Sequence, residues 1–358
     1  MSTQTVEEER ASGVVYGPSG LQAVGETWAN RLYRGDNLSV LRELLDDAAV
    51  RGQVNLVYID PPFGTGQRYT FSQGRHATIS RVADGSTAYD DALTGEAYLR
   101  FLRPRLEVLR ELLADDGSIY VHVDCKVGHY VRVVMDEVFG ASNFRNDITR
   151  VKCNPKNFKR YGYGNTKDMI LFYTKGEGFT WNYPREPFTE EELRRLFPKV
   201  DDHGRRYTTT PLHAPGETQK GPSGQPWKGL KPPAGRHWRY HPSTLSRLDE
   251  EGLIEWSATG NPRKKLFAHE VEAKGRTMQD VWVFKDPQKT RYPTEKNLDM
   301  LRLIVRASSN PGDLVMDCFC GAGGTLVAAQ ESGRRWIGID SSEAAIGICK
   351  RRLGIDQG

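Results

Sequence analysis

The pattern of apolar and polar positions predicts a mixed α/β fold. Residues 54–59 form a short apolar run that is rich in β-branched side chains and ends at an acid followed by two prolines. This is the profile of a buried parallel strand that stops at its carboxyl end. Because ligands of open α/β sheets bind outside the carboxyl ends of the strands, the loop after this strand is a candidate active site.

A helix and a second strand are predicted after that loop. Leucines recur at the spacing of one helical face, at Leu99, Leu102, Leu106, Leu109 and Leu113. They predict an amphipathic helix, which Pro104 either kinks or begins. After a turn at Asp116 and Gly117, alternating apolar residues from 119 to 123 predict a strand. This part of the chain therefore predicts a strand, a helix and a strand in order.

A second regular region lies at the C-terminus. Residues 298–307 have helical apolar spacing, and residues 314–317 follow a turn and predict a strand. A tight loop at 321–324, a helix at 325–332 and a strand from Arg335 that ends at Asp340 come next. Together they predict a βαβ unit.

Between these regions, from 151 to 277, periodic signals weaken, and Gly, Pro and aromatic residues replace them. We expect four segments: a mobile N-terminal arm at 1–28, one half of an α/β domain at 29–150, an inserted module at 151–277 and the second half at 278–358.

Composition excludes several classes of protein. With 358 residues, 38% hydrophobic and 27% charged, the chain resembles a soluble globular protein, and no apolar run approaches the roughly 18 residues of a membrane span. The N-terminus lacks the features of a signal peptide, so we expect a cytoplasmic protein. Five irregularly spaced cysteines predict free thiols. Cys318 and Cys320 lack further ligands at metal-binding spacing, so no metal is expected.

The net charge of +4 is unevenly distributed. Between Val151 and Tyr240 the chain holds 17 Lys or Arg against 9 Asp or Glu, and 14 of its 35 aromatic residues. This combination predicts a loop-rich insert that faces a polyanion.

The first candidate for chemistry is the glycine loop from Asp317 to Gly323. Glycines let the backbone approach a nucleotide-like ligand, and Asp340, at the end of the next strand, can accept hydrogen bonds from ribose hydroxyls. A tight structural turn is the alternative. A dinucleotide site would have a third glycine at position 326, which is Leu, so NAD is disfavoured.

The second candidate is the loop Asp60-Pro61-Pro62-Phe63. The prolines keep the Pro61 carbonyl out of the sheet, so that it stands beside the Asp60 carboxylate as a second acceptor. Two acceptors suit an aromatic amine, whose nitrogen they can draw toward sp³ geometry, while Phe63 would stack on the ring. An ordinary strand stop is the alternative.

The two loops together resemble the amino-group (N6-adenine and N4-cytosine) DNA methyltransferases. Their order, with Asp-Pro-Pro-Phe before Asp-x-Phe-x-Gly-x-Gly, looks like the circularly permuted β class, and the resemblance covers about residues 30–355. It implies a Rossmann-like, S-adenosylmethionine-dependent α/β fold. Residues 29–150 would be its catalytic half, 151–277 a target-recognition insert and 278–358 its cofactor-binding half.

The resemblance implies roles for single residues. Asp60, Pro61, Pro62 and Phe63 would be catalytic. The cofactor would be held by Asp36 at its adenine, by Thr294 and Lys296 around its methionine end, by Asp317, Phe319, Gly321 and Gly323 in the glycine loop, and by Asp340 at its ribose. Cys318 and Cys320 depart from the family pattern, at positions whose side chains the chemistry does not need.

The substrate implied is double-stranded DNA, with the target base flipped out of the stack. Basic side chains would contact its phosphates as a group: Lys152, Lys156, Lys159, Arg160, Arg205, Arg206 and Lys228. Two further partners stay open, a cognate restriction endonuclease and a second copy of the chain in a homodimer.

The target base is the largest open choice. Asp at the first position of the catalytic motif favours adenine N6, although it also occurs in enzymes that act on cytosine N4. Methyltransferases that act on RNA or on a protein glutamine are a further alternative, as is a DNA-binding module without catalysis. That module would explain the basic insert but leaves Asp60, Asp340 and the glycine loop without a common purpose.

Overall fold

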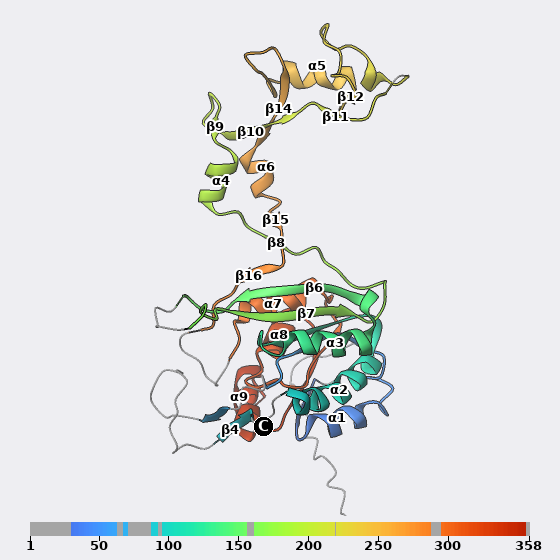
Figure 1. Ribbon diagram of the computed structural model, residues 1–358, viewed down its shortest axis with the longest axis vertical. Helices are drawn as coiled ribbons and strands as arrows, with labels where there is room; N and C mark the ends of the chain where they lie inside the picture. The colour runs from blue at the N-terminus through green and yellow to red at the C-terminus, as the bar shows by residue number, and fades with distance from the viewer. Residues whose placement is uncertain are drawn as a thin grey trace, which may run out of the picture. The chain divides into compact units, whose positions relative to one another are not determined.

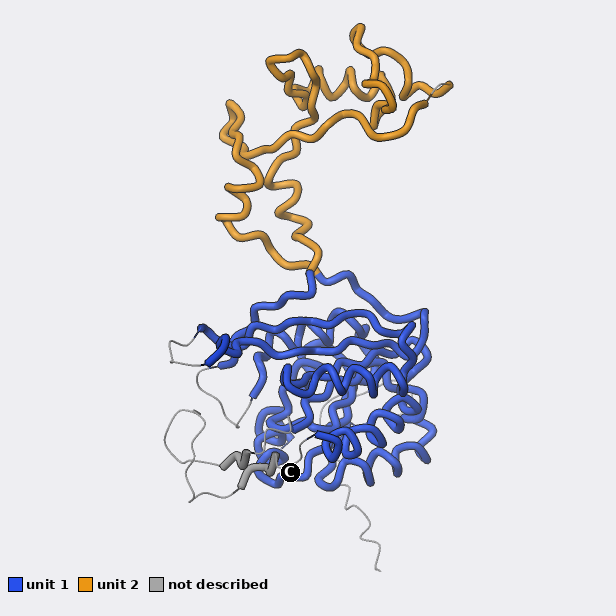
Figure 2. The backbone as a smooth tube through the Cα atoms, in the orientation of Figure 1, with its two compact units in different colours: residues 1–184, 279–358 blue, residues 185–278 orange. Residues whose placement is uncertain are grey.

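The computed structural model of the chain describes residues 30–62, 67–70, 87–91, 95–155, 161–218, 220–287 and 295–355. The chain divides into two compact units, residues 1–184 with 279–358 (unit 1) and residues 185–278 (unit 2), which Figure 2 colours separately. The predicted arm at 1–28 lies outside the described residues.

Unit 1 is built on a mixed sheet of eight strands (Figure 1). In spatial order these are β1 (Arg31–Arg34), β18 (Arg335–Asp340), β17 (Leu314–Asp317), β2 (Val54–Ile59), β5 (Leu113–Val123), β7 (Lys167–Thr174), β6 (Phe144–Val151) and β16 (Val281–Val283). Only the pairs that include β7 are antiparallel. The carboxyl ends of β18, β17, β2 and β5 therefore meet at one edge of the sheet.

The helices of unit 1 are α1 (Asn37–Leu44), α2 (Gly95–Leu112), α3 (Gly128–Phe139), η1 (Ala141–Asn143), α7 (Leu298–Ala307), α8 (Gly324–Glu331) and α9 (Glu343–Leu353). The first three share one apolar core with the central strands. Five of the six residues of β2 are buried, which is the pattern of a strand covered on both faces. A short hairpin, β3 (Gln67–Thr70) with β4 (Thr87–Asp91), pairs separately.

Most predicted elements of unit 1 agree with the structure, but Leu113, expected in the helix, and the turn expected at Asp116 and Gly117 lie within β5. The strand at 54–59 and the helix at 298–307 coincide with β2 and α7, and β17, α8 and β18 form the expected βαβ unit. Pro104 lies inside α2, which begins earlier than the leucine pattern suggested, at Gly95. None of the helices in the described ranges is long and apolar enough to cross a bilayer.

Unit 2 consists of short elements around small cores. They are β8 (Arg185–Glu186), α4 (Glu190–Leu196), β9 (Lys199–Val200), β10 (Arg206–Pro211), β11 (His213–Pro215), η2 (Pro222–Gly224), β12 (Arg236–Trp238), α5 (Pro242–Glu250), β13 (Ile254–Trp256), β14 (Pro262–Phe267), α6 (Ala268–Glu272) and β15 (Arg276–Thr277). Strands β13, β14, β10 and β9 form an antiparallel sheet. One core gathers around Trp227 and Trp238, and another around Leu193 and Phe197.

The compact unit begins later than the insert expected from composition. Residues 151–184 belong to unit 1, because β7 pairs between β5 and β6 in the central sheet. The C-terminal edge at Met278 lies one residue from the expected one. The apolar run Met169–Tyr173 is buried in this strand, so Phe172 and Tyr173 serve the core of unit 1, whereas Tyr161, Tyr163 and Tyr183 are exposed.

Candidate active site

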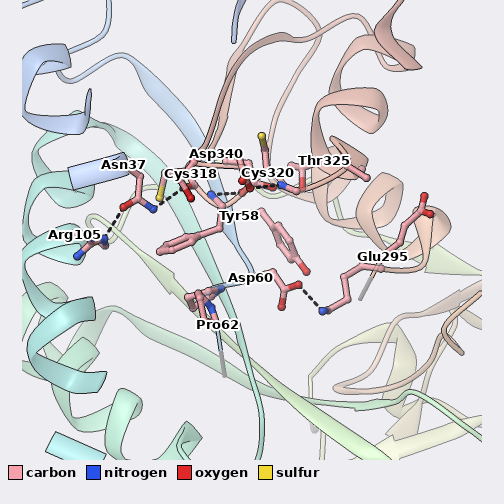
Figure 3. A pocket seen from close by; sticks show the side chains of 18 of the residues that line it. Asn37, Tyr58, Asp60, Pro62, Arg105, Glu295, Cys318, Cys320, Thr325 and Asp340 are labelled. Carbon is pink, nitrogen blue, oxygen red and sulfur yellow. Dashed lines mark hydrogen bonds and ion pairs between the residues drawn. The ribbon is translucent and has the colours of Figure 1, made fainter. Parts of the chain in front are cut away.

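A cavity of about 350 Å³ lies where strands β17, β2 and β18 end (Figure 3). Each strand delivers a carboxylate to it: Asp317 ends β17, Asp60 follows β2 and Asp340 ends β18. Other segments complete the lining: Gly35, Asp36 and Asn37 beside α1, Tyr58 on β2, Phe101 and Arg105 on α2, and Glu295, Lys296 and Leu301 around the start of α7.

The glycine loop between β17 and α8 is held to the end of β18 through its backbone amides. The amide of Gly321 donates to Asp340 Oδ2 over 2.9 Å, and the amide of Cys320 donates to the carbonyl of Ile339 over 3.1 Å. Gly323 caps α8 in the left-handed region, with φ of 75°. A Cβ at this position would stand 2.8 Å from Cys349 Sγ, so both the backbone angle and the space require glycine.

Two carboxyl groups of the pocket have raised pKa values. Burial raises the pKa of Asp317 to about 7, and the charges of Asp60 and Asp340 add to this effect against hydrogen bonds from Thr325 and the Phe319 amide. Burial also raises the pKa of Asp340, although the amides of Ser342 and Gly321 oppose it. The pocket therefore concentrates negative charge that a cationic ligand would relieve.

A buried arginine ties two helices to the glycine loop. Arg105 of α2 donates to Asn37 Oδ1 over 2.7 Å and to Asp36 Oδ2 over 3.1 Å, and Asn37 Nδ2 donates to the carbonyl of Cys318 over 2.7 Å. Burial lowers the pKa of Arg105, against the charge of Asp36. Sequence reasoning missed Asn37 and Arg105. A signal was present, since Arg105 interrupts the apolar face of the leucine helix between Leu102 and Leu109.

Asp60 has two oxygens with different surroundings. Oδ2 forms an ion pair with Lys296 Nζ. Oδ1 is buried and has no hydrogen-bond partner among the described residues. Pro61 is buried beside it and Pro62 is half-buried, whereas Phe63 lies outside the described residues.

A buried polar row leads away from the pocket across the sheet. The Tyr58 hydroxyl lies 2.8 Å from His122 Nδ1, and His122 Nε2 lies 3.2 Å from Asp168 Oδ2. Burial alone would raise the pKa of Asp168, but His122 and Lys152 lower it overall, while burial lowers the pKa of His122. An ionised Asp168 only accepts, so a neutral His122 donates from Nε2 and accepts a hydrogen bond from the Tyr58 hydroxyl at Nδ1.

The sequence predicted a different role for Lys152, a contact with DNA phosphates. The structure places its ammonium 2.5 Å from Asp168 Oδ1 and 3.7 Å from Asp124 Oδ2, inside this polar row. Arg150, with a fully buried side chain, also pairs with Asp168. Lys152 thus compensates buried carboxylates, which disfavours the phosphate contact expected of it. The sequence did contain a signal for this polar row, because polar residues interrupt the apolar strands near their ends.

The other residues expected at phosphates differ in their surroundings. Arg205 pairs with Asp201, and Lys228 pairs with Asp249, so both have acidic partners within unit 2. Arg206 is exposed on β10. The remaining three, Lys156, Lys159 and Arg160, lie outside the described residues.

The structure brings most of the expected cofactor residues together. Asp36, Lys296, Asp317, Phe319, Gly321 and Asp340 all line the cavity. Gly323 shapes the loop behind it. Thr294 lies outside the described residues.

Comparisons with known proteins agree with this arrangement. A family model described as DNA methylase, for N6/N4 methyltransferases, matches residues 54–351. The type II methyltransferase M.EcaI of Enterobacter cloacae is 42% identical over 332 residues, which are 91% of this chain and 70% of that protein. The StyLTI Mod subunit, of a type III restriction-modification enzyme of Salmonella typhimurium, is 26% identical over 84% of this chain, and the chain spans about half (49%) of that relative's length.

A solved structure shares the fold. The PvuII DNA methyltransferase (cytosine-N4-specific) aligns with a TM-score of 0.50 at 12% identity, over 91% of this chain and 87% of that one. The expected α/β methyltransferase fold is therefore confirmed. The circularly permuted order of the β class stays a prediction.

Proposed function

Since the chain belongs to the N6/N4 DNA methylase family, we propose that it transfers a methyl group from S-adenosylmethionine to an exocyclic amino group of double-stranded DNA. The observation that carries the proposal is the Asp60 carboxylate, which offers a buried, unpartnered oxygen at a pocket formed by the glycine loop. Adenine N6 is the favoured target, because the catalytic motif begins with Asp, and cytosine N4 is the alternative.

The residues present fit the cofactor. The cavity has the volume of a small-molecule site. Its carboxylates suit a ligand that carries a sulfonium and an ammonium group, and Phe101 and Phe319 offer an aromatic wall for an adenine. Asp340 would hold the ribose, Asp36 the adenine, and Thr294 the methionine end. When bound, the cofactor supplies an electrophilic methyl group on a positively charged sulfur.

The chain's own residues would prepare the amine. Asp60 Oδ1 and the Pro61 carbonyl accept hydrogen bonds from the two amino protons and draw the nitrogen toward sp³ geometry. The nitrogen lone pair would then face the methyl group that the bound cofactor supplies, and the C–S electrons would leave with the sulfur. One amino proton passes to Asp60 and from there to solvent. Phe63 would stack on the flipped base and replace its lost neighbours.

Unit 2 is proposed to recognise the target sequence. It holds 17 Lys or Arg against 13 Asp or Glu, a surplus equal to the net charge of the whole chain. Its binding to DNA should therefore weaken steeply with salt. A cognate restriction endonuclease is a proposed partner, since a relative's name places that relative in a restriction-modification enzyme.

Methyl transfer tests the proposal directly. Purified protein is incubated with tritiated S-adenosylmethionine and, in parallel, with plasmid DNA, tRNA and protein, and we expect label in DNA. Asp60→Ala should lower the rate at least about 100-fold, because it removes an acceptor that acts on the reacting amine. Asp299→Ala, at an exposed acid of α7 in the same unit, is the matched control and should stay near the wild-type rate.

Two outcomes would contradict the proposal: label in RNA or protein alone, and DNA methylation that survives Asp60→Ala at near wild-type rate. The base is identified separately. Modification-sensitive sequencing of plasmid DNA from a host that expresses the chain reports both the methylated base and its sequence context, and methyl groups on cytosine alone would replace adenine as the target.

A further inference from the structure

Lys296 contacts the carboxylate that the proposed reaction uses. Its Nζ pairs with Asp60 Oδ2, and the side chains of Lys296 and Asp60 are 9% and 17% exposed. The other oxygen, Oδ1, is buried without a partner in the described residues. Figure 3 marks this ion pair with a dashed line that ends at the labelled Asp60 carboxylate. One oxygen is thus held, and the other is left for a donor from outside the chain.

We propose that Lys296 is a positioning residue for catalysis: it fixes Asp60 Oδ2 and so orients Oδ1 toward the target amine. This inference rests on the proposed function and revises the part that the sequence suggested for Lys296, which was to enclose the cofactor. Lys296 acts on the reaction through Asp60.

Charge explains why a cation is needed at this place. Asp317 and Asp340 line the same cavity, so an uncompensated Asp60 would add a further negative charge to a partly buried site. A buried carboxylate without a partner is costly, and an ammonium group at contact distance offsets that cost. An ammonium group also donates in several directions, so it can hold one oxygen without covering the other.

The backbone that carries Lys296 is fixed at its next residue. Asn297 caps α7, where its side chain accepts from the amides of Asp299 and Met300, and its Nδ2 donates to the carbonyl of Lys285 over 2.9 Å. Met300 is fully buried in the first turn of that helix. A side chain that starts beside a capped helix end, whose first turn is anchored by the buried Met300, loses little further freedom when it holds Asp60.

The preceding residue offers a matched comparison. Glu295 Oε1 lies 3.0 Å from Arg352 Nη1, and the same nitrogen donates to the carbonyl of Ala322 over 2.8 Å. Glu295 therefore supports the glycine loop, whereas Lys296 supports the catalytic loop. Substitutions at these two neighbouring residues should affect different steps.

The experiment compares Lys296→Met, Lys296→Arg, Glu295→Gln, Asp60→Asn and the double variant Asp60→Asn/Lys296→Met with the wild type. Calorimetry gives the Kd for S-adenosylmethionine, and single turnovers at saturating cofactor and DNA give the rate of transfer. Thermal unfolding is followed for every variant.

We expect Lys296→Met to lower the transfer rate about 10- to 100-fold, because a displaced catalytic group costs this much, while the cofactor Kd changes less than about threefold. Lys296→Arg should recover part of the rate. In the Asp60→Asn background the Lys296→Met change should cost little more, because the group on which it acts has gone. Glu295→Gln should mainly raise the cofactor Kd.

Two results would overturn the inference. A raised cofactor Kd in Lys296→Met with an unchanged saturated rate would make Lys296 a cofactor ligand, and rate losses that add in the double variant would make it independent of Asp60. A wild type that transfers no methyl group to DNA would refute the proposed function instead. In that case two measurements still decide whether Lys296 acts on Asp60. One is the cofactor Kd, and the other is whether the shifts in unfolding midpoint of Asp60→Asn and Lys296→Met add in the double variant.

Discussion

Substitutions in the glycine loop should lower the free energy of unfolding, and Gly323 offers the clearest test. Gly323→Ala should destabilise the fold by about 2 to 3 kcal/mol, because it adds a contact with Cys349 to a left-handed backbone. Gly354, the C-cap of α9, is the control: it is also left-handed but has open space, so its Ala variant should cost about 1 kcal/mol. Urea unfolding measures both. Cys349→Ala should recover part of the loss at 323, and equal costs at the two glycines would refute the contact.

Asp317 should make stability depend on pH. Its pKa in the folded chain, about 7, lies above its ordinary value, so the folded state binds more protons between the two. Stability from this group is therefore complete in acid and is lost as pH rises toward and through 7. Urea unfolding at pH 5 and pH 8 measures this effect. The free energy of unfolding should fall less between these pH values in Asp317→Asn than in the wild type. An unchanged difference between the two pH values would show that Asp317 ionises freely.

Residues were predictable from the sequence where backbone geometry alone determines their place. Asp60, Asp317 and Asp340 follow apolar strands, and parallel strands end at one edge, so their meeting in one pocket could be expected. Asn37 and Arg105 could not be placed in this way, because their contacts depend on how α1 and α2 pack. The charge pattern suggested a DNA contact for Lys152, and only the structure shows its acidic partners.

At the scale of elements, one carboxylate connects three strands of the sheet. Asp168 on β7 meets His122 on β5, and Arg150 and Lys152 at the end of β6. Asp168→Asn should destabilise unit 1 by about 3 to 5 kcal/mol, because it removes the buried negative charge that Arg150 and Lys152 share. Asp286→Asn is the control; its half-exposed carboxylate pairs with the same Arg150, and its loss should be smaller.

Asp168→Asn should also change how the stability of the chain responds to acid. The pKa of Asp168 lies below its ordinary value, so its contribution is present above that value and is lost as pH falls toward the folded pKa. Unfolding midpoints between pH 7 and pH 3 should therefore fall less steeply in Asp168→Asn than in the wild type. A parallel pH dependence in both proteins would contradict an ionised Asp168 in the folded chain.

Elements were predictable where apolar periodicity continued over a whole segment. The runs that became β2, α7 and the βαβ unit have this continuity, and their positions were predicted closely. Strand β7 has it too, but its aromatic residues lie in a region whose Gly, Pro and charge content suggested an insert. Composition averaged over 90 residues cannot separate a buried strand from the loops beside it, since both contribute aromatic residues.

At the scale of the whole molecule, unit 2 has the features of a removable insertion. It has its own small cores, and its two ends lie together, because Thr277 of β15 is the direct neighbour of Arg185 of β8. Antiparallel neighbours stand about 5 Å apart, so a short Gly-Ser linker can join residue 184 to residue 279. The described residues that line the cavity all belong to unit 1. Deletion of residues 185–278 should therefore preserve the fold of unit 1.

We expect the shortened chain to bind S-adenosylmethionine with a Kd near that of the full chain, and to lose DNA binding and methyl transfer. The cofactor residues remain, whereas the surplus of positive charge is removed with unit 2. Calorimetry measures the cofactor, and fluorescence anisotropy measures DNA at increasing salt. Full-length Asp60→Asn is the control, because it should bind DNA with the wild-type salt dependence and yet transfer slowly. Site-specific methylation by the shortened chain would show that unit 1 recognises DNA by itself.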